Sequence, residues 1–251
     1  MENENGLPTS PTTDTQHPTR GSIWIPWIIK GLILATILGI WFYQQSGDKP
    51  SANLANQANA DLEARNFKPL SGAVQTLIAD KSKPSIPTQS HPLLFMEAPD
   101  FTLADVEGAD FHLAKEAESE PVVLVFYYGY SCSHCVSQLF GLAKDIEIFR
   151  ELGAKVIAIS PDTKELTRER YAEYGTFPFR VLSDPGNRVA QLYSTYIPAK
   201  NPMDDGELMH GTFVILPGGK VVWANRGDQP FTNNLTLIRA LAAKHPSLKQ
   251  S

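Results

Sequence analysis

Two cysteines lie three residues apart in the segment Gly129-Tyr130-Ser131-Cys132-Ser133-His134-Cys135, and the 251-residue chain contains no others. Thiols at this spacing share one face of a helix when they occupy its first turn. There the free backbone N–H groups and the positive end of the helix dipole favour a thiolate at the first cysteine. The pattern therefore predicts a reversible disulfide, with Cys132 as the attacking thiolate and Cys135 as the resolving thiol.

His134 lies between the two thiols in the sequence. A cation or hydrogen-bond donor beside a thiolate lowers the thiol pKa and stabilises the reduced form, which makes the disulfide a stronger oxidant. We therefore expect Cys132, Cys135 and His134 to be the catalytic residues, with Cys132 and Cys135 as the redox-active disulfide. His210 is a candidate supporting residue.

The two cysteines have two simpler interpretations, a structural zinc site and burial as small hydrophobic residues. A structural zinc site would need a second Cys-x-x-Cys, and His210 would supply only a third ligand, so we expect no metal and no cofactor. Both cysteines could also be small buried hydrophobic residues. We expect a strand-to-helix junction to expose them instead.

The elements around the motif alternate between strands and helices. Pro121 to Tyr128 is a β-branched and aromatic run, which is typical of a central strand covered on both faces. The pattern predicts an α/β fold, a thioredoxin-like mixed sheet flanked by helices. The other predicted helices are 132–150, 163–174, 187–193 and 234–243, and the other predicted strands are 155–160, 179–182, 213–216 and 220–224.

The overall composition, with 42% hydrophobic and 20% charged residues, is that of a folded protein. The formal charge is −5, and the sequence has no strongly basic character, so a nucleic-acid partner is not expected.

An apolar run with a single charge, Lys30, covers residues 22–43 and has aromatic residues at both ends. It predicts one transmembrane helix in contact with membrane lipid. We expect four parts: a disordered tail (1–21), the membrane helix (22–43), a tether with short helices (44–91) and the redox domain (92–251). The few flanking cations favour a bacterial inner membrane, single-pass, with the carboxy-terminal domain in the periplasm.

Several ordered motifs together resemble the thioredoxin-fold redoxins. They are Ala98-Pro99-Asp100-Phe101, Phe126-Tyr127-Tyr128-Gly129 with the Cys-Ser-His-Cys segment, the run 156–162, Leu182-Ser183-Asp184-Pro185 and Gly211-Thr212-Phe213-Val214-Ile215. Within these, the chain looks most like the peroxiredoxin-like branch, the alkyl hydroperoxide reductase C and thiol-specific antioxidant group. The resemblance implies an oxidoreductase with antioxidant activity.

Aligned on Phe126 and Tyr127, the peroxiredoxin pattern would place Cys135 at the peroxidatic cysteine. Cys132 then falls at the family's threonine, and His210 falls at its later arginine. In the thioredoxin-like interpretation, by contrast, Cys132 attacks and Cys135 resolves.

Three functions follow from these patterns. We expect a membrane-anchored thiol-disulfide oxidoreductase that acts on thiol or disulfide proteins and exchanges electrons with an unidentified donor protein. One alternative is a thiol peroxidase, in which a hydroperoxide oxidises Cys135 to a sulfenic acid and Cys132 condenses with it. The other is a copper-delivery protein resembling the Sco-type assembly factors, with Cys132, Cys135 and His210 as ligands.

Overall fold

The computed structural model describes residues 30, 31, 33–38, 57, 60, 70–201 and 206–245. The chain divides into two units, Met1–Asp61 and Leu62–Ser251. Most of the predicted span 22–43 lies outside the described residues, and its described part, 30–31 and 33–38, is helical and exposed. No helix in the described part of the chain is long and apolar enough to cross a membrane.

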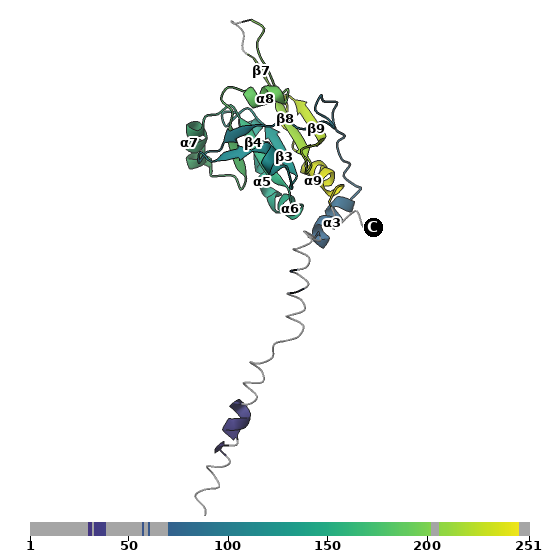
Figure 1. The fold of residues 1–251 in the computed structure, drawn as a ribbon, viewed down its shortest axis with the longest axis vertical. Coiled ribbons are helices and arrows are strands. Elements are labelled where there is room, and N and C mark those ends of the chain that lie inside the picture. Colours follow the sequence, from purple (N-terminus) through teal and green to yellow (C-terminus); the bar gives the residue numbers. More distant parts are fainter. Residues whose placement is uncertain are drawn as a thin grey trace, which may run out of the picture. The chain divides into compact units, whose positions relative to one another are not determined.

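The second unit alternates strands and helices along the chain (Figure 1). The helices are α3 (Gly72–Ala79), α4 (Leu113–Glu116), α5 (Ser133–Lys144), α6 (Ile146–Glu151), α7 (Lys164–Tyr174), α8 (Arg188–Leu192) and α9 (Asn234–Ala242). The strands are β1 (Thr102–Ala104), β2 (Asp110–His112), β3 (Val122–Phe126), β4 (Lys155–Ser160), β5 (Arg180–Ser183), β6 (Tyr196–Ile197), β7 (Glu207–Leu208), β8 (His210–Ile215) and β9 (Val221–Gly227).

Five strands form the central sheet in the order β5-β4-β3-β8-β9. β3, β4 and β5 are parallel, whereas β8 pairs antiparallel with both β3 and β9. The predicted mixed sheet is thereby confirmed. β3 lies in the middle and is buried along its whole length, as its apolar run predicted. The segment that follows β3 therefore leaves the centre of the sheet.

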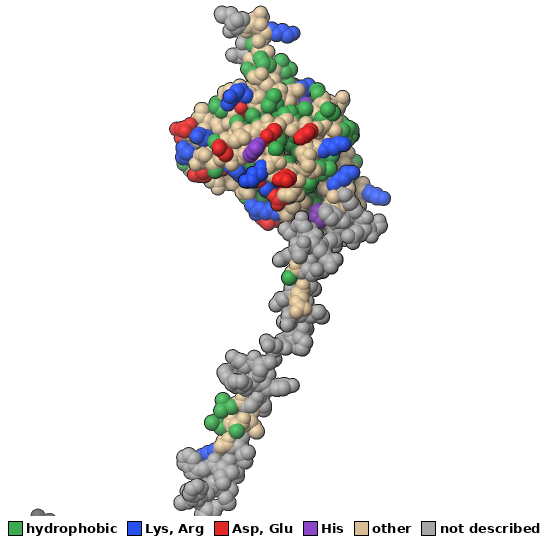
Figure 2. Space-filling model, viewed as in Figure 1, with side chains coloured by type: hydrophobic (Ala, Val, Ile, Leu, Met, Phe, Trp, Pro, Cys, Tyr) green, Lys and Arg blue, Asp and Glu red, His purple; other side chains and the backbone are tan. Residues whose placement is uncertain are grey.

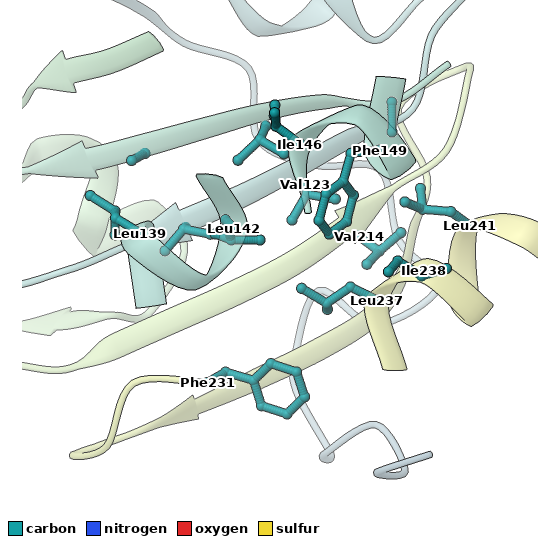
Figure 3. Packing of buried hydrophobic residues seen from close by; sticks show 14 of the residues in the cluster. Val123, Leu139, Leu142, Ile146, Phe149, Val214, Phe231, Leu237, Ile238 and Leu241 are labelled. Atoms are coloured by element: carbon teal, nitrogen blue, oxygen red, sulfur yellow. The ribbon is translucent and has the colours of Figure 1, made fainter. Parts of the chain in front are cut away.

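Alternate residues of β3 face two separate cores, as the two-residue period of a strand requires. Val123 and Val125 pack with α5, α6 and α9, while Leu124 and Phe126 pack with α8 and the β1–β2 hairpin. Figure 3 shows the first core, where side chains of α5, α6 and α9 converge on the sheet. Helix α5 is thus held along its apolar face, and its first turn projects beyond the end of β3.

The helix predicted over 132–150 is divided at Asp145 into α5 and α6. Asp145 has non-helical dihedrals (φ −102°, ψ 11°), and Asn234 Nδ2 donates to its carboxylate at 2.8 Å. This contact ties the break to α9, which the local sequence could not indicate. The small strands β1, β2, β6 and β7 were also not predicted, because two or three residues are too few to show a period.

The second half of the predicted tether, from Leu70 onward, packs on the domain. Leu70 and Val74 are buried in the first core, and the Arg239 guanidinium on α9 donates to the carbonyls of Ile78, Asp80 and Lys83. Farther along, the Gln89 and Phe95 N–H groups donate to carbonyls of β9. This segment covers the outer edge of β9, which protects an edge strand from pairing with another chain.

Ion pairs tie the first hairpin and α4 to the parallel edge of the sheet. Arg180 at the start of β5 pairs with Asp105 at 2.8 Å, and Lys155 at the start of β4 pairs with both Glu116 and Glu120. Figure 2 shows acidic and basic side chains interspersed on the face in view. These pairs lie at the amino ends of β4 and β5. The carboxyl ends of the parallel strands β3, β4 and β5 lie at the other end of the sheet, where the cysteine segment begins.

Candidate active site

The cysteine pair lies at the amino end of α5, as the sequence predicted. Cys132 is the N-cap residue, and its Sγ accepts a hydrogen bond from the Cys135 N–H at 3.2 Å. The two cysteines form a disulfide with a Cα–Cα distance of 5.2 Å. A thiolate at Cys132 would keep the Cys135 N–H donor and the positive helix end, both of which stabilise negative charge.

The two sulfur-bearing residues differ in exposure. Cys135 is 2% exposed, whereas Cys132 is partly exposed, with exposed Ser131 and Ser133 on either side. The expectation that the strand-to-helix junction exposes both residues is therefore wrong for Cys135. It is buried on the first turn of α5, next to Val136, which belongs to the core that holds the rest of the helix. An external protein thiol thus meets Cys132 first.

His134 is exposed on the first turn of α5, and its Nε2 lies 2.8 Å from Gln229 Oε1, just beyond β9. This contact fixes the ring between α5 and the β9 end of the sheet. The proposed effect of His134 on the Cys132 thiolate stays a prediction.

His210 lies at the start of β8 and is 2% exposed. Its ring stacks on that of Tyr128, with centroids 4.4 Å apart. Burial, reinforced by the nearby charge of His134, lowers the pKa of His210 to about 4. Because β8 pairs with β3, the structure brings this neutral imidazole next to the loop that carries the cysteines. It is therefore a hydrogen-bonding group without charge near neutral pH.

Gln138 is a buried polar residue that the sequence analysis missed. It lies one turn after Cys135 on α5 and is 1% exposed. Its Nε2 donates to Thr212 Oγ1 at 2.8 Å, and its Oε1 accepts from the Phe231 N–H at 3.2 Å. The pair joins the helix that bears the cysteines to β8. The sequence feature that could have identified Gln138 is a polar side chain on the apolar face of the helix.

A second residue that the sequence analysis did not single out is Asp162, which lies between β4 and α7. It follows β4, is 8% exposed, and its Oδ2 accepts from the Tyr130 N–H at 2.8 Å. The contact reaches the loop two residues before Cys132. Asp162 and Tyr130 are 32 positions apart in the sequence, and local pattern does not reveal such a partner.

A groove of about 510 Å³ runs beside α5 along the length of the helix. Its walls include Tyr130, Val136 and Phe140, and Lys144 lies at one end. Phe140 is 46% exposed and packs on Phe177 with ring centroids 5.2 Å apart. The groove thus offers an apolar surface adjacent to the cysteines.

The three residues considered as copper ligands do not form a metal site in this structure, because both sulfur atoms are in the disulfide. Across residues 70–201 and 206–245, no cluster of three or more His, Cys, Asp or Glu side chains is arranged to hold a metal ion.

Comparison with known proteins places these features in a family. A model of the AhpC/TSA family matches residues 96–224. Peroxiredoxin Q from Sedum lineare is 37% identical over 91 residues, 36% of this chain and 48% of that protein. The selenocysteine-containing peroxiredoxin PrxU from Peptoclostridium acidaminophilum is 30% identical over 134 residues, 49% of this chain and 62% of that protein. The chain thus spans about half the length of the first of these relatives.

Solved structures show the same fold. Peroxidoxin BcpB from Mycobacterium tuberculosis superposes with a TM-score of 0.54 at 23% identity, covering 61% of this chain and 99% of that one. Peroxiredoxin Q from Xanthomonas campestris gives a TM-score of 0.51 at 22% identity, covering 58% and 91%. The matched family segment contains the central strand, the disulfide and His210. By this match, the chain belongs to the AhpC/TSA family of thioredoxin-like redox proteins.

Proposed function

We propose that this protein is a thiol peroxidase that reduces hydroperoxides through the Cys132–Cys135 pair. The observation that carries the proposal is a disulfide at the first turn of α5 within the segment that the AhpC/TSA model matches. The relatives named peroxiredoxin support peroxide as the oxidant. This function was the alternative in the sequence analysis, and the comparisons favour it over a general disulfide oxidoreductase.

In the first step, the Cys135 thiolate attacks one oxygen of the hydroperoxide, and the O–O bond breaks. The products are a Cys135 sulfenic acid and an alcohol, or water when the substrate is hydrogen peroxide, with one proton taken up by the leaving oxygen. Cys135 has this role because it aligns with the family's peroxidatic cysteine. Its burial limits access to small or slender groups, which suits a peroxide better than a protein disulfide.

In the second step, the Cys132 thiol condenses with the sulfenic acid, forming the disulfide and releasing water. The two residues already have a Cα–Cα distance of 5.2 Å, which is normal for a disulfide, so the helix does not need to unfold. A dithiol protein then attacks Cys132, the more exposed sulfur, and returns both cysteines to thiols. The buried Cys135 thus reacts with the peroxide, and the more exposed Cys132 reacts with the reducing protein.

His210 supplies polarity where the family pattern has an arginine. Near neutral pH its imidazole is uncharged, because its pKa is lowered to about 4. A neutral imidazole can donate one hydrogen bond to a peroxide oxygen, whereas an arginine would also add a positive charge. We therefore expect slower peroxide reduction than with an arginine at this position.

A disulfide exchange activity remains a second candidate, because one observation favours it. Cys132 is the partly exposed N-cap residue and Cys135 is buried, an arrangement that lets Cys132 attack a protein disulfide.

Single-cysteine variants separate the two functions. For a peroxidase, Cys135→Ser abolishes peroxide consumption, whereas reduced Cys132→Ser consumes one equivalent and yields a sulfenic acid that dimedone traps. For an exchange enzyme, Cys135→Ser accumulates mixed disulfides with protein substrates and Cys132→Ser is inert. Peroxide consumption that persists in Cys135→Ser would contradict the role given to Cys135.

We also propose that residues 22–43 anchor the chain in a bacterial inner membrane, with residues 92–251 in the periplasm. The support is the apolar run with its aromatic ends and the bias of flanking cations. Carbonate should fail to extract the full chain from membranes. After reduction of intact cells, a membrane-impermeant maleimide should label Cys132, and labelling only after lysis would contradict the orientation.

A further inference from the structure

Asp162 packs directly beneath the loop that leads to the cysteines. Its Oδ2 accepts the Tyr130 N–H at 2.8 Å, and its carboxylate lies against the Cα of Gly129. A Cβ added at Gly129 would lie 2.4 Å from Asp162 Oδ1, and Gly129 has φ +100°. Only glycine combines this dihedral with so close a carboxylate. The loop conformation and the carboxylate position therefore depend on each other.

The surroundings of Asp162 disfavour the ionised form of its carboxyl group. Burial raises the pKa of its carboxyl, and the Tyr130 hydrogen bond and the Arg170 charge oppose that shift only in part. The titratable and charged groups around it are the phenols of Tyr127 and Tyr130 and the guanidinium of Arg170 on α7. A buried carboxylate with so few donors is retained at a cost in stability.

Asp184 provides the contrast within the same sheet. It follows β5, is also buried, and accepts the N–H groups of Arg188, Val189 and Ala190 at 3.0 Å each. These three donors begin α8, so its role is to stabilise that helix. The side-chain oxygens of Asp162 receive a donor from the cysteine loop instead.

We propose that Asp162 is a positioning residue for the redox pair: as a carboxylate it holds Gly129 and Tyr130, and thereby keeps Cys132 at the N-cap of α5. This inference rests on the proposed redox function of the pair, but not on peroxide as the oxidant. An ionised acceptor makes the stronger hydrogen bond. Protonation of Asp162 therefore loosens the loop and withdraws the helix end from the Cys132 sulfur.

The reaction rate of Cys132 should therefore depend on two protons in acid, one on its own thiol and one on the Asp162 carboxyl. A lone thiol loses about tenfold in rate for each pH unit below its pKa, because the thiolate is the nucleophile. If protonation of Asp162 also lowers reactivity, the loss exceeds about tenfold per pH unit over the range where Asp162 titrates, and the limit is about a hundredfold per pH unit if the protonated form does not react. In the wild type, the logarithm of the rate then falls at low pH by more than one unit per pH unit, and we call this part of the pH profile the steep acid limb.

The experiment uses the reduced full-length chain in detergent and measures its alkylation by iodoacetamide from about pH 4 to about pH 9, because the thioether that forms stays on the cysteine that reacted. Peptide masses assign the label to Cys132 or Cys135. The wild type should show the steep limb at Cys132. Asp162→Asn should show the one-proton slope, because its amide does not titrate. The matched control Asp184→Asn should keep the steep limb.

Arg170→Gln keeps the test decisive if Asp162→Asn does not fold. Arg170 contacts Glu173 near the surface and its charge favours the Asp162 carboxylate, so its removal should shift the steep limb to higher pH. Profiles of Asp162→Asn and Arg170→Gln that superimpose on the wild type would overturn the proposal. A wild-type profile that becomes shallower in acid would also overturn it, since the carboxylate would then act by repulsion. Because no peroxide is used, a chain inactive on peroxide still gives this result.

Discussion

Two buried aspartates follow neighbouring parallel strands, and they differ in what their carboxylates hold. Asp184, after β5, accepts three N–H groups at the start of α8, whereas Asp162, after β4, accepts one from the loop that carries the cysteines. Burial raises the pKa of both carboxyls. Similar burial therefore serves two purposes in our proposal: the Asp184 carboxylate stabilises a helix, and the Asp162 carboxylate positions the cysteine segment.

The largest effect on stability is expected from Asp184→Ala. This change leaves three N–H groups without their acceptor and should lower the free energy of unfolding by about 4 kcal/mol. Urea denaturation followed by circular dichroism measures the loss. Under conditions where the variant is folded, its Cys132 reactivity should match the wild type, and a changed reactivity would remove the distinction between the two aspartates.

His210 is a third buried titratable residue near the cysteine loop, and it lies on β8, the antiparallel neighbour of β3. Its folded-state pKa of about 4 is below the ordinary 6.5, so the unfolded chain binds more protons between these values. Stability should therefore fall as the pH drops from 6.5 to about 4, by at most about 3 kcal/mol from this residue.

His210→Phe tests this dependence, because phenylalanine can stack on Tyr128 and does not titrate. The variant should lose less stability than the wild type over the same pH range in urea titrations. His91, another buried histidine with a lowered pKa, is present in both proteins and provides a common background. Parallel stability curves would show that His210 does not cause the acid sensitivity.

A pair of glycine substitutions compares the two turns directly. Gly129→Ala places a Cβ against the Asp162 carboxylate at a positive φ and should cost about 2 kcal/mol. It should also slow the reaction of Cys132 with thiol reagents. Gly186→Ala, in the turn of Asp184, meets only Arg188 Cγ at 3.7 Å, an ordinary contact. Equal losses in the two variants would contradict the close fit at Gly129.

The smallest effect is expected from Thr163→Ala, one residue after Asp162. Thr163 is the N-cap of α7, and its Oγ1 accepts the Leu166 N–H at 3.2 Å. Loss of this cap should cost about 1 kcal/mol in thermal or urea unfolding. The acid limb of Cys132 reactivity should stay unchanged, which would separate Asp162 from its neighbour.

The sequence predicted much of the fold because its main elements carry strong local patterns. The run 121–128 became β3, the strand 155–160 became β4, and Thr163 begins α7 as its N-cap. The break at Asp145 was missed, and the residue that contacts the Asp145 carboxylate there, Asn234, is far away in the sequence. Local periodicity contains no information about such a partner.

The sequence predicted only the part of the candidate site that depends on local pattern or on the family resemblance. The Cys132–Cys135 spacing indicated a disulfide, and a family resemblance directed attention to His210. The burial of Cys135 and the contacts of Gln138 and Asp162 depend on how α5 lies on the sheet. These are tertiary features, so neither residue type nor spacing could reveal them.

Reduction of peroxide by the Cys132–Cys135 pair can be measured in a single turnover. The reduced full-length chain is mixed with one equivalent of hydrogen peroxide or cumene hydroperoxide, and quenched samples are analysed by intact mass. We predict loss of two hydrogens, mapped to the Cys132–Cys135 disulfide, at a rate about a thousandfold above that of free cysteine. Oxidation no faster than free cysteine, together with rapid oxidation by a protein disulfide, would contradict the peroxidase assignment.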